Sequence, residues 1–412
     1  MDYNQLQLEA INSTDSKIVV VAPPGAGKTA TLVGAISKYV DENPFKKVTA
    51  ITFTRKAASE LRLKLADYPQ VEACTIHSWS LKELNRIGAK YKFKPTILQD
   101  NQIQEILQYL CRQMGYYSIN YYLLTAYIMG NYNIDISDGV KARFNKILLA
   151  YIEYKRGNGL YDFTDLPLYL HDMLTEYNER ITSVDGLFVD EFQDVDSTQA
   201  TVFTMVDAEK YFYIGDPDQS IYIFRGANAG IFDELKDFTK LRLVENYRSY
   251  QPIIDYSTIL RSGEYENPLE ISHLVPSWIK CVRGNAEGEV YTLNEDGEGY
   301  NLITEKHMDG FNLVKNYMDK KPYILCRSNK QVKAIQELGY KNVSTIHQAK
   351  GLQYSDVIYV AAPLSCEEEV NIGYVACTRA QNSLMIVSNN AFAEILKDLK
   401  AEDTNAFTDI LF

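Results

Sequence analysis

The stretch at 22–29 constrains the fold of this chain more than any other. It reads Ala22-Pro23-Pro24-Gly25-Ala26-Gly27-Lys28-Thr29. A β-branched run at 18–21 precedes it and a helix-compatible stretch at 30–40 follows. In that context, consecutive backbone N–H groups cradle phosphate oxygens and the helix N-terminus adds partial positive charge. The sequence therefore predicts a nucleotide site in which Lys28 reaches the β- and γ-phosphates and Thr29 holds Mg²⁺.

Length and composition indicate a globular protein of about two or three domains, because 412 residues exceed one core. The chain has no long apolar run and no basic segment followed by an apolar one at its start. We therefore expect no membrane span, no secretory signal and a cytoplasmic location, in a host cell if the chain is viral. The six cysteines are scattered, which predicts reduced thiols and no zinc site. A net charge of −12 argues against a generally basic nucleic-acid binder but allows a local basic groove.

Strand and helix patterns alternate on both sides of a helical stretch. Between about 80 and 159, apolar residues recur with helical spacing, as at Ile103, Ile106, Leu107 and Leu110. We interpret this stretch as a helical insertion. Outside it, the repeated strand–helix order predicts a parallel sheet in an α/β fold. The strands of the first half are expected at 18–21, 48–53, 71–76, 186–189 and 210–214.

Two carboxylates follow the apolar strand at 186–189. Asp190 and Glu191 suit the site opposite Lys28, because the first carboxylate reaches Mg²⁺ and the second polarises the attacking water. Gln219, which follows the strand at 210–214, lies where a loop could sense the γ-phosphate. These positions predict an ATPase site.

Aromatic and cationic residues are interleaved just beyond Gln219. Tyr222, Phe224 and Arg225 combine flat faces for bases with a charge for phosphate, as a sequence-neutral single-strand site does. The alternative is that Tyr222 and Phe224 fill a core from one strand face. Two interpretations also remain for the tyrosines of the insertion, base stacking or ordinary packing, at positions 116, 117, 121, 122, 127 and 132. Gln7 taken alone is expected on the surface.

These blocks, in this order, resemble superfamily 1 helicases of the UvrD/Rep/PcrA type, in which alanine at the position of Ala22 is usual. The resemblance covers nearly the whole chain. The matching blocks are Gln7, 22–29, 52–58 (TFTRKAA), 75–78 (TIHS), 161–166 (YDFTDL), 190–194 (DEFQD), 215–227, 246–249 (NYRS), 324–329 (ILCRSN), 345–354 and 374–380 (YVACTRA).

The resemblance implies two RecA-like parallel-sheet cores with ATP and Mg²⁺ between them. The first would comprise 1–80 and 160–240, with the insertion at 81–159, and the second 241–412. Catalytic roles are implied for Lys28, Asp190, Glu191, Gln219, Arg248 and Arg379, with Mg²⁺ held by Thr29 and Asp190. ATP contacts are implied for Gln7, Ala22, Pro23, Pro24, Gly25, Ala26, Gly27, Lys28, Thr29, Ala30, Tyr247, Arg248, Gln353 and Arg379. Contacts with single-stranded DNA are implied for Phe53, Arg55, His77, Tyr222, Phe224, Arg225 and His347.

Two departures from the family pattern stand out. Gln353 occupies the position of a usual glutamate, which puts sugar selectivity in question. Only residues 330–344 separate two motifs between which the family carries a large accessory domain. We therefore expect a reduced, monomeric 3′→5′ DNA helicase acting on single strands and junctions. The alternatives are a single-strand translocase that displaces proteins or serves recombination, and a nucleotide-binding switch without motor activity.

Overall fold

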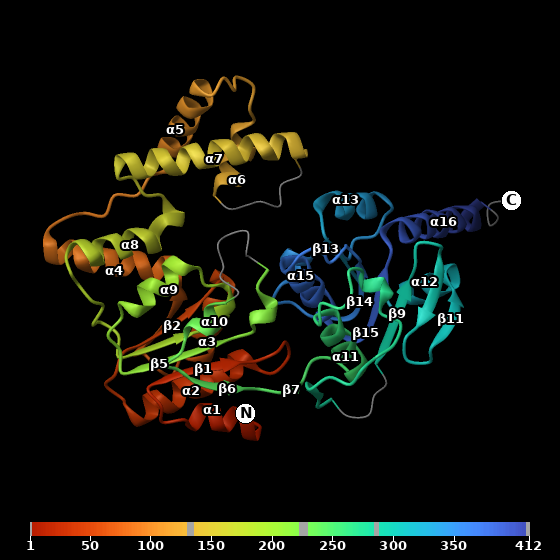
Figure 1. The fold of residues 1–412 in the computed structure, drawn as a ribbon, viewed down its shortest axis with the longest axis horizontal. Coiled ribbons are helices and arrows are strands. Elements are labelled where there is room, and N and C mark those ends of the chain that lie inside the picture. Colours follow the sequence, from red (N-terminus) through yellow and green to blue (C-terminus); the bar gives the residue numbers. More distant parts are fainter. Residues whose placement is uncertain (1, 130–135, 222–229, 284–287, 409–412) are drawn as a thin grey trace. The chain divides into compact units, whose positions relative to one another are not determined.

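The computed structural model describes residues 2–129, 136–221, 230–283 and 288–408. Contacts divide the chain into two compact units. The first unit comprises Met1–Val20, Thr29–Ile214 and Arg225–Lys240, and the second comprises Val21–Lys28, Gly215–Phe224 and Leu241–Phe412. Each unit is built on a sheet flanked by helices, so the predicted α/β class is confirmed (Figure 1). The boundaries of the cores and the insertion stay a prediction.

The sheet of the first unit has six strands in the order β3-β2-β4-β5-β1-β6. β2 pairs in parallel with β3 and β4, and β4 pairs in parallel with β5. All residues of β2 and β4 are buried, as expected for parallel strands covered on both faces. The strands are β1 (Lys17–Val21), β2 (Val48–Thr52), β3 (Val71–Thr75), β4 (Gly186–Val189), β5 (Lys210–Gly215) and β6 (Thr239–Arg242).

The predicted strands of the first half therefore form, with ends that differ by a residue or so. The helix expected after 54 also forms, and Thr54 caps it by accepting a hydrogen bond from the Ala57 N–H at 3.1 Å. The helices of this core are α1 (Gln5–Asn12), α2 (Lys28–Glu42), α3 (Arg55–Lys64), α4 (Ile76–Tyr91), α8 (Leu166–Glu176), α9 (Ser197–Thr204) and α10 (Ile231–Glu234).

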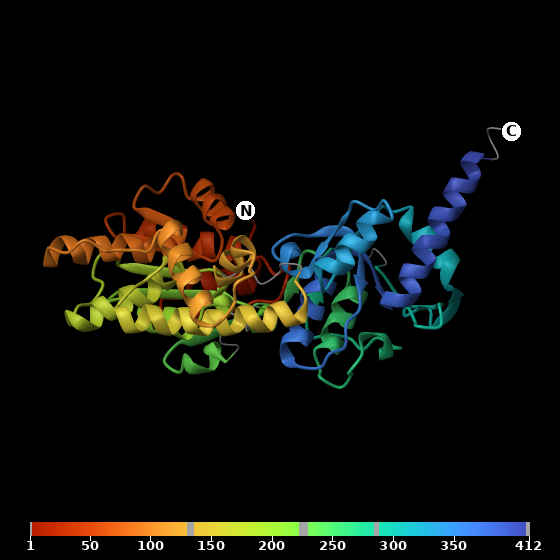
Figure 2. The same ribbon diagram turned by 90° about the horizontal axis from the view of Figure 1, so that it is seen from above.

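The insertion is helical in its described residues, as its periodicity predicted. It contains α5 (Asp100–Gln113), α6 (Tyr121–Ile128) and α7 (Asp138–Asn158), which share a small core of their own. In Figure 1, α4 and α8 lie between this group and the sheet, and α7 runs as one unbroken helix in Figure 2. Tyr127 is 2% exposed and packs in this core, whereas Tyr117 and Tyr122 are more than 80% exposed. Tyr132 lies outside the described residues.

The second unit contains a seven-stranded sheet in the order β11-β10-β9-β15-β14-β12-β13. Five strands, β9, β15, β14, β12 and β13, pair in parallel. β10 pairs antiparallel with β9 and β11 pairs antiparallel with β10, and the sequence patterns did not predict these two strands. The strands are β9 (Glu289–Leu293), β10 (Glu298–Asn301), β11 (Lys306–Asp309), β12 (Tyr323–Cys326), β13 (Val343–Thr345), β14 (Tyr354–Val360) and β15 (Ala380–Val387). A separate parallel pair joins β7 (Glu245–Asn246) to β8 (Lys280–Cys281).

Alternating side chains of this sheet build two cores on its opposite faces. Leu384 and Ile386 of β15 belong to the core with α11 and α15, and Met385 and Val387 belong to the core with α12 and α16. The helices are α11 (Gln251–Leu260), α12 (Gly310–Met318), α13 (Asn329–Glu337), α14 (Ile346–Ala349), α15 (Glu367–Cys377) and α16 (Asn389–Thr408). Between β12 and β13 the chain forms α13.

Candidate functional site

The glycine-rich loop connects β1 to α2, in the order strand, turn and helix that its sequence predicted. Gly25 and Gly27 adopt φ angles of 76° and 81°, which favour glycine. A Cβ on Gly25 would lie 2.7 Å from the Arg248 Cβ and 2.8 Å from the Asn246 Oδ1. Ala22 is fully buried, and its N–H donates to the Gly215 carbonyl at 2.9 Å. The backbone of the loop is therefore held in place by its neighbours in the second unit.

The start of α2 brings a hydroxyl to the end of β4. The Thr29 Oγ1 donates to the Asp190 Oδ2 at 3.1 Å, and Asp190 is 5% exposed. A hydroxyl and a carboxylate are hard oxygen donors of the kind that Mg²⁺ takes beside substrate phosphates. The residues present therefore fit a magnesium ion. Lys28, the preceding residue, donates from its Nζ to the Ala22 carbonyl at 3.4 Å.

Glu191 has a left-handed backbone, with φ at 52°. This conformation is uncommon for a residue other than glycine, and such residues gather at functional sites. The Glu191 N–H donates to the Asp190 Oδ1 at 3.0 Å, and its side-chain Oε2 accepts from the Gln193 Nε2 at 2.6 Å. Each of the two carboxylates therefore accepts a hydrogen bond from a nearby residue of the same turn.

In the second unit, the segment that begins at Asn246 contacts the loop directly. The buried Asn246 donates from Nδ2 to the Pro24 carbonyl at 2.7 Å, and its Oδ1 accepts from the Arg248 N–H. The Tyr247 N–H donates to the Gly25 carbonyl at 2.9 Å. Sequence reasoning gave Asn246 no role, although it stands inside a quoted motif.

Tyr247 and Arg248 present their side chains near this contact. The Tyr247 side chain is 45% exposed, which leaves its ring a surface on which a base can stack. The Arg248 Nε donates to the Gln353 Oε1 at 3.0 Å, and its Nη1 donates to the Thr378 carbonyl. The amide of Gln353 thus makes a hydrogen bond with an arginine that was expected to contact phosphate.

Arg379 and Gln219 also meet within the second unit. Arg379 is 1% exposed, and its Nη2 donates to the Gln219 Oε1 at 3.2 Å. The Gln219 Nε2 donates to the Asp216 Oδ2, and the Gln219 carbonyl accepts from the Lys350 Nζ at 2.9 Å. Lys350 and Asp216 were not singled out from the sequence. Both residues lie in blocks that match the family, 215–227 and 345–354, and this could have marked them as candidates.

The predicted DNA contacts fall into three groups. Phe53 follows β2 and His77 opens α4 after β3, so both come from the carboxyl ends of paired parallel strands, and Arg55 is exposed nearby in the chain. His347 is 8% exposed on α14 of the second unit. Tyr222, Phe224 and Arg225 lie outside the described residues.

The His77 ring stacks on Phe163, with centroids 5.3 Å apart and planes 13° from parallel. Burial is the main cause that lowers the pKa of His77 below 6.5, against a smaller opposing effect of a hydrogen bond with the Thr164 backbone. The lowered pKa favours the neutral form of the ring. Phe163 itself is 41% exposed.

Gln7 is 5% exposed, so the expectation of a surface side chain is wrong. Its Oε1 accepts from the Asn4 N–H at 3.0 Å, while the Asn4 Oδ1 accepts from the Gln7 N–H at 2.8 Å. This reciprocal pair is a capping box at the start of α1. The single-residue pattern could not distinguish a capping glutamine from a solvated one.

Comparison with known proteins agrees with this arrangement. Residues 3–240, more than half of the chain, match the UvrD/REP helicase N-terminal domain. The chain belongs to the UvrD/REP helicase family. Residues 342–387 also match the UvrD-like helicase C-terminal domain.

Individual members of the family are identical to the chain at about a quarter of the aligned residues. A probable DNA helicase of Mycoplasma pneumoniae is 27% identical, over 93% of this chain and 83% of the relative. The ATP-dependent DNA helicase Rep of Buchnera aphidicola is 27% identical over 82% of this chain and 53% of the relative. DNA helicase II of Escherichia coli is 28% identical over 81% of this chain and 49% of the relative. The chain thus spans about half the length of the last two.

None of the described helices is long and apolar enough to cross a membrane. Within the same residues, no group of three or more histidine, cysteine, aspartate or glutamate side chains could hold a metal ion. A Mg²⁺ ion held by one hydroxyl, one carboxylate and nucleotide phosphates needs no such group.

Proposed function

We propose that this chain is an ATP-dependent DNA helicase that moves 3′→5′ along single-stranded DNA and unwinds duplex DNA. The observation that carries the proposal is the bond between the Thr29 hydroxyl and Asp190, with Glu191 next to it in a left-handed turn. Phosphoryl transfer needs these groups beside the loop lysine. The relatives named as DNA helicases support DNA as the polymer.

In this proposal each group of the ATP site has one task. Lys28 and the loop N–H groups bind the phosphates, and Glu191 accepts the proton of the attacking water. Mg²⁺ held by Thr29 and Asp190 supplies charge neutralisation on the β- and γ-phosphate oxygens when it is bound. Arg248 and Arg379 stabilise the charge that develops on the transferred phosphoryl group.

The nucleoside part of ATP is bound by the remaining groups. Tyr247 stacks on the adenine, and Gln7 reads its edge. Gln353 meets the ribose, where a neutral amide can still donate to or accept from a hydroxyl. The bond between Gln353 and Arg248 then links sugar recognition to the phosphate contact.

Single-stranded DNA is held by a second set of side chains. Phe53 and His77 lie at the ends of neighbouring strands, where ligands of parallel sheets commonly bind. We include Arg55 and His347 in this set, together with Tyr222, Phe224 and Arg225. Base stacking of this kind is worth about 1–3 kcal/mol per base and is tolerant of sequence. We propose a monomer that acts on single strands and on junctions with duplex.

Unwinding of three substrates tests the proposal, namely duplexes with a 3′ tail, with a 5′ tail and with blunt ends, each with ATP. The 3′-tailed duplex should be opened and the other two left intact, and the Lys28→Ala protein should open none. Preference for the 5′-tailed duplex would overturn the polarity. Absence of ATPase stimulation by single-stranded DNA would overturn the motor itself.

A second candidate function is an ATP-driven translocase whose movement has another result than duplex unwinding. Between β12 and β13, where the family resemblance implies an accessory domain, this chain has α13. Fewer duplex contacts favour a translocase that displaces proteins with little unwinding. Displacement of streptavidin from a biotinylated single strand, at a rate far above that of duplex opening, would support this candidate.

A further inference from the structure

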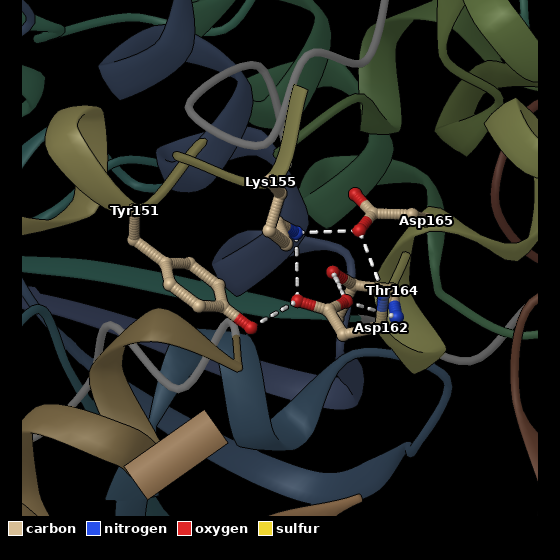
Figure 3. A network of polar contacts seen from close by, with 5 residues as sticks. All are labelled: Tyr151, Lys155, Asp162, Thr164 and Asp165. Carbon is tan, nitrogen blue, oxygen red and sulfur yellow. Dashed lines mark hydrogen bonds and ion pairs between the residues drawn. The ribbon is translucent and has the colours of Figure 1, made fainter. Parts of the chain in front are cut away.

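A buried lysine joins the helical insertion to the turn that follows it. Lys155 lies on α7 and is 5% exposed, and its Nζ lies 2.7 Å from the Asp162 Oδ2 and 2.5 Å from the Asp165 Oδ2 (Figure 3). The hydroxyl of Tyr151, one turn earlier on α7, donates to the same oxygen of Asp162 at 3.0 Å. Breaking such a buried ion pair leaves an uncompensated charge, so the contact resists separation.

The turn itself is closed by the same two carboxylates. The Asp162 Oδ1 accepts from the N–H of Thr164 at 2.8 Å and from its hydroxyl at 2.6 Å. The Asp165 Oδ2 accepts from the Asp162 N–H at 2.9 Å. Residues 163 and 164 are thus held between two anchored positions, in the short helix η1 (Phe163–Asp165).

The first of these residues contacts His77 directly. Phe163 stacks on the His77 ring, and the Thr164 backbone acts on the pKa of that ring. His77 belongs to α4, on the other side of the insertion in the sequence. A continuous set of contacts therefore runs from Lys155 on the insertion, through the turn, to a residue that the proposed function places in the DNA groove.

The two carboxylates of the network are not equivalent. Each oxygen of Asp162 accepts two hydrogen bonds, from Tyr151 and Lys155 on one side and from Thr164 on the other. An asparagine there would turn its amide NH₂ toward either the Lys155 ammonium or the Thr164 N–H, and neither can accept. Asp165 accepts its network bonds on Oδ2 alone, so an asparagine can keep both with its oxygen.

We propose that Lys155 and Asp162 are positioning residues for single-stranded DNA, because they hold the turn that sets the His77 ring against Phe163. The inference rests on the proposed function, in which His77 contacts DNA. The inference gives the helical insertion a role in binding single-stranded DNA, since Lys155 and Tyr151 both come from α7. Neither residue touches ATP or DNA in this assignment, so their loss should change DNA affinity and not the chemistry of hydrolysis.

The test compares Asp162→Asn with Asp165→Asn, which remove the same charge from the same network. Tyr151→Phe is a third, milder variant that deletes one hydrogen bond. Binding of a fluorescein-labelled oligothymidylate of about 16 nucleotides is measured by anisotropy. ATPase is measured against oligothymidylate concentration. The ring resonances of His77, which report its stacking on Phe163, are followed by NMR with isotope-labelled histidine, which is practical because the chain has five histidines.

Asp162→Asn should raise the dissociation constant for oligothymidylate by about 10-fold or more, the effect of losing a hydrogen bond to a charged group. Its maximal ATPase rate at saturating DNA should stay near that of the wild type. The NMR resonances of the His77 ring should move, because the ring loses its stacking on Phe163; its pKa is not the readout, since loss of burial raises that pKa and loss of the Asp162 charge lowers it. Tyr151→Phe should shift the same quantities less, and Asp165→Asn should leave them unchanged.

Equal behaviour of Asp162→Asn and Asp165→Asn would overturn the inference, as would unchanged DNA affinity and unchanged His77 ring resonances in a folded Asp162→Asn protein. If Asp162→Asn does not fold, Tyr151→Phe decides by the same two readouts. A wild-type protein that neither binds oligothymidylate nor is stimulated by it would instead overturn the proposed function. DNA binding by the wild-type protein therefore distinguishes failure of the proposed function from failure of this inference.

Discussion

The hydroxyl of Thr29 lies 3.1 Å from the carboxylate Oδ2 of Asp190, although 161 positions separate them in the chain. The first residue lies in the first turn of α2, after the glycine-rich loop. The second follows β4, which lies two places from β1 in the sheet. Both oxygens are hard donors, and the lysine that precedes Thr29 completes the groups that a bound nucleotide would meet. This pair defines where hydrolysis is proposed to occur.

Glu191→Gln should abolish steady-state ATP hydrolysis, by about 100-fold or more, while nucleotide binding stays close to normal. The substitution removes the general base but keeps shape and hydrogen-bonding capacity. Binding of a fluorescent ATP analogue and steady-state ATPase should be measured on the same preparation. Lys28→Ala provides the comparison, since it should lose hydrolysis by removing the phosphate contact. Near-normal turnover in Glu191→Gln would refute the assignment.

Arg248→Ala and Arg379→Ala should both lower turnover strongly and leave oligothymidylate binding nearly unchanged. They should differ in stability, because Arg379 is 1% exposed and Arg248 is only partly buried. Removal of the buried Arg379 side chain should lower the free energy of unfolding by about 3 kcal/mol or more. Urea unfolding measures the loss of stability, and the ATPase and oligothymidylate-binding assays measure the loss of function, so the two effects can be separated. A variant that loses DNA affinity and ATPase activity to the same extent would show that its arginine belongs to the DNA-binding groove.

Gly25→Ala should be more damaging than substitution of another glycine with the same backbone. Gly25 and Gly263 have φ angles of 76° and 75°, but a Cβ meets Arg248 only at Gly25, and nothing lies within 4 Å at Gly263. Gly263→Ala should therefore cost about 1–2 kcal/mol from conformation alone. Gly25→Ala should cost more and also weaken ATP binding. Equal unfolding midpoints for the two variants would show that the contact with Arg248 yields easily.

Stability should fall as the pH drops below about 6.5, in part because of His77. Burial lowers its pKa in the folded chain, and the nearby Asp162 opposes this to a lesser degree. Between the folded and unfolded pKa values the unfolded chain binds more protons, so stability rises with pH in that window. Urea unfolding at pH 5 and pH 8 should show a smaller difference for His77→Asn than for the wild type. An unchanged difference would contradict a buried neutral ring.

Much of the architecture could be predicted because its signals are local. The β-branched run before the glycine-rich loop, the apolar strand before Asp190 and the helical spacing near Ile103 each depend on a few neighbouring residues. All three appear in the structure as expected. Thr54 was also found from its position alone, since an N-cap is set by the next helical turn.

The antiparallel strands β10 and β11 were not predicted, because β11 is exposed throughout and shows no alternation. The local pattern around Gln7 predicted exposure for a similar reason, since burial depends on what packs against α1, whereas the family resemblance implied an ATP contact there. Short polar segments carry little periodicity. Their conformation follows from pairing and packing that distant residues provide.

Local patterns in the sequence predict most of the elements in their order, and the chemistry of the residues placed at their ends. Which of those residues meet is set by tertiary packing. The Thr29–Asp190 pair, the hold of Asn246 on the loop carbonyl of Pro24 and the bonds of Lys155 to two aspartates all arise from packing. Hydrophobic periodicity places a strand or helix, but hydrogen bonds between separate elements depend on register and close approach, which no local pattern encodes.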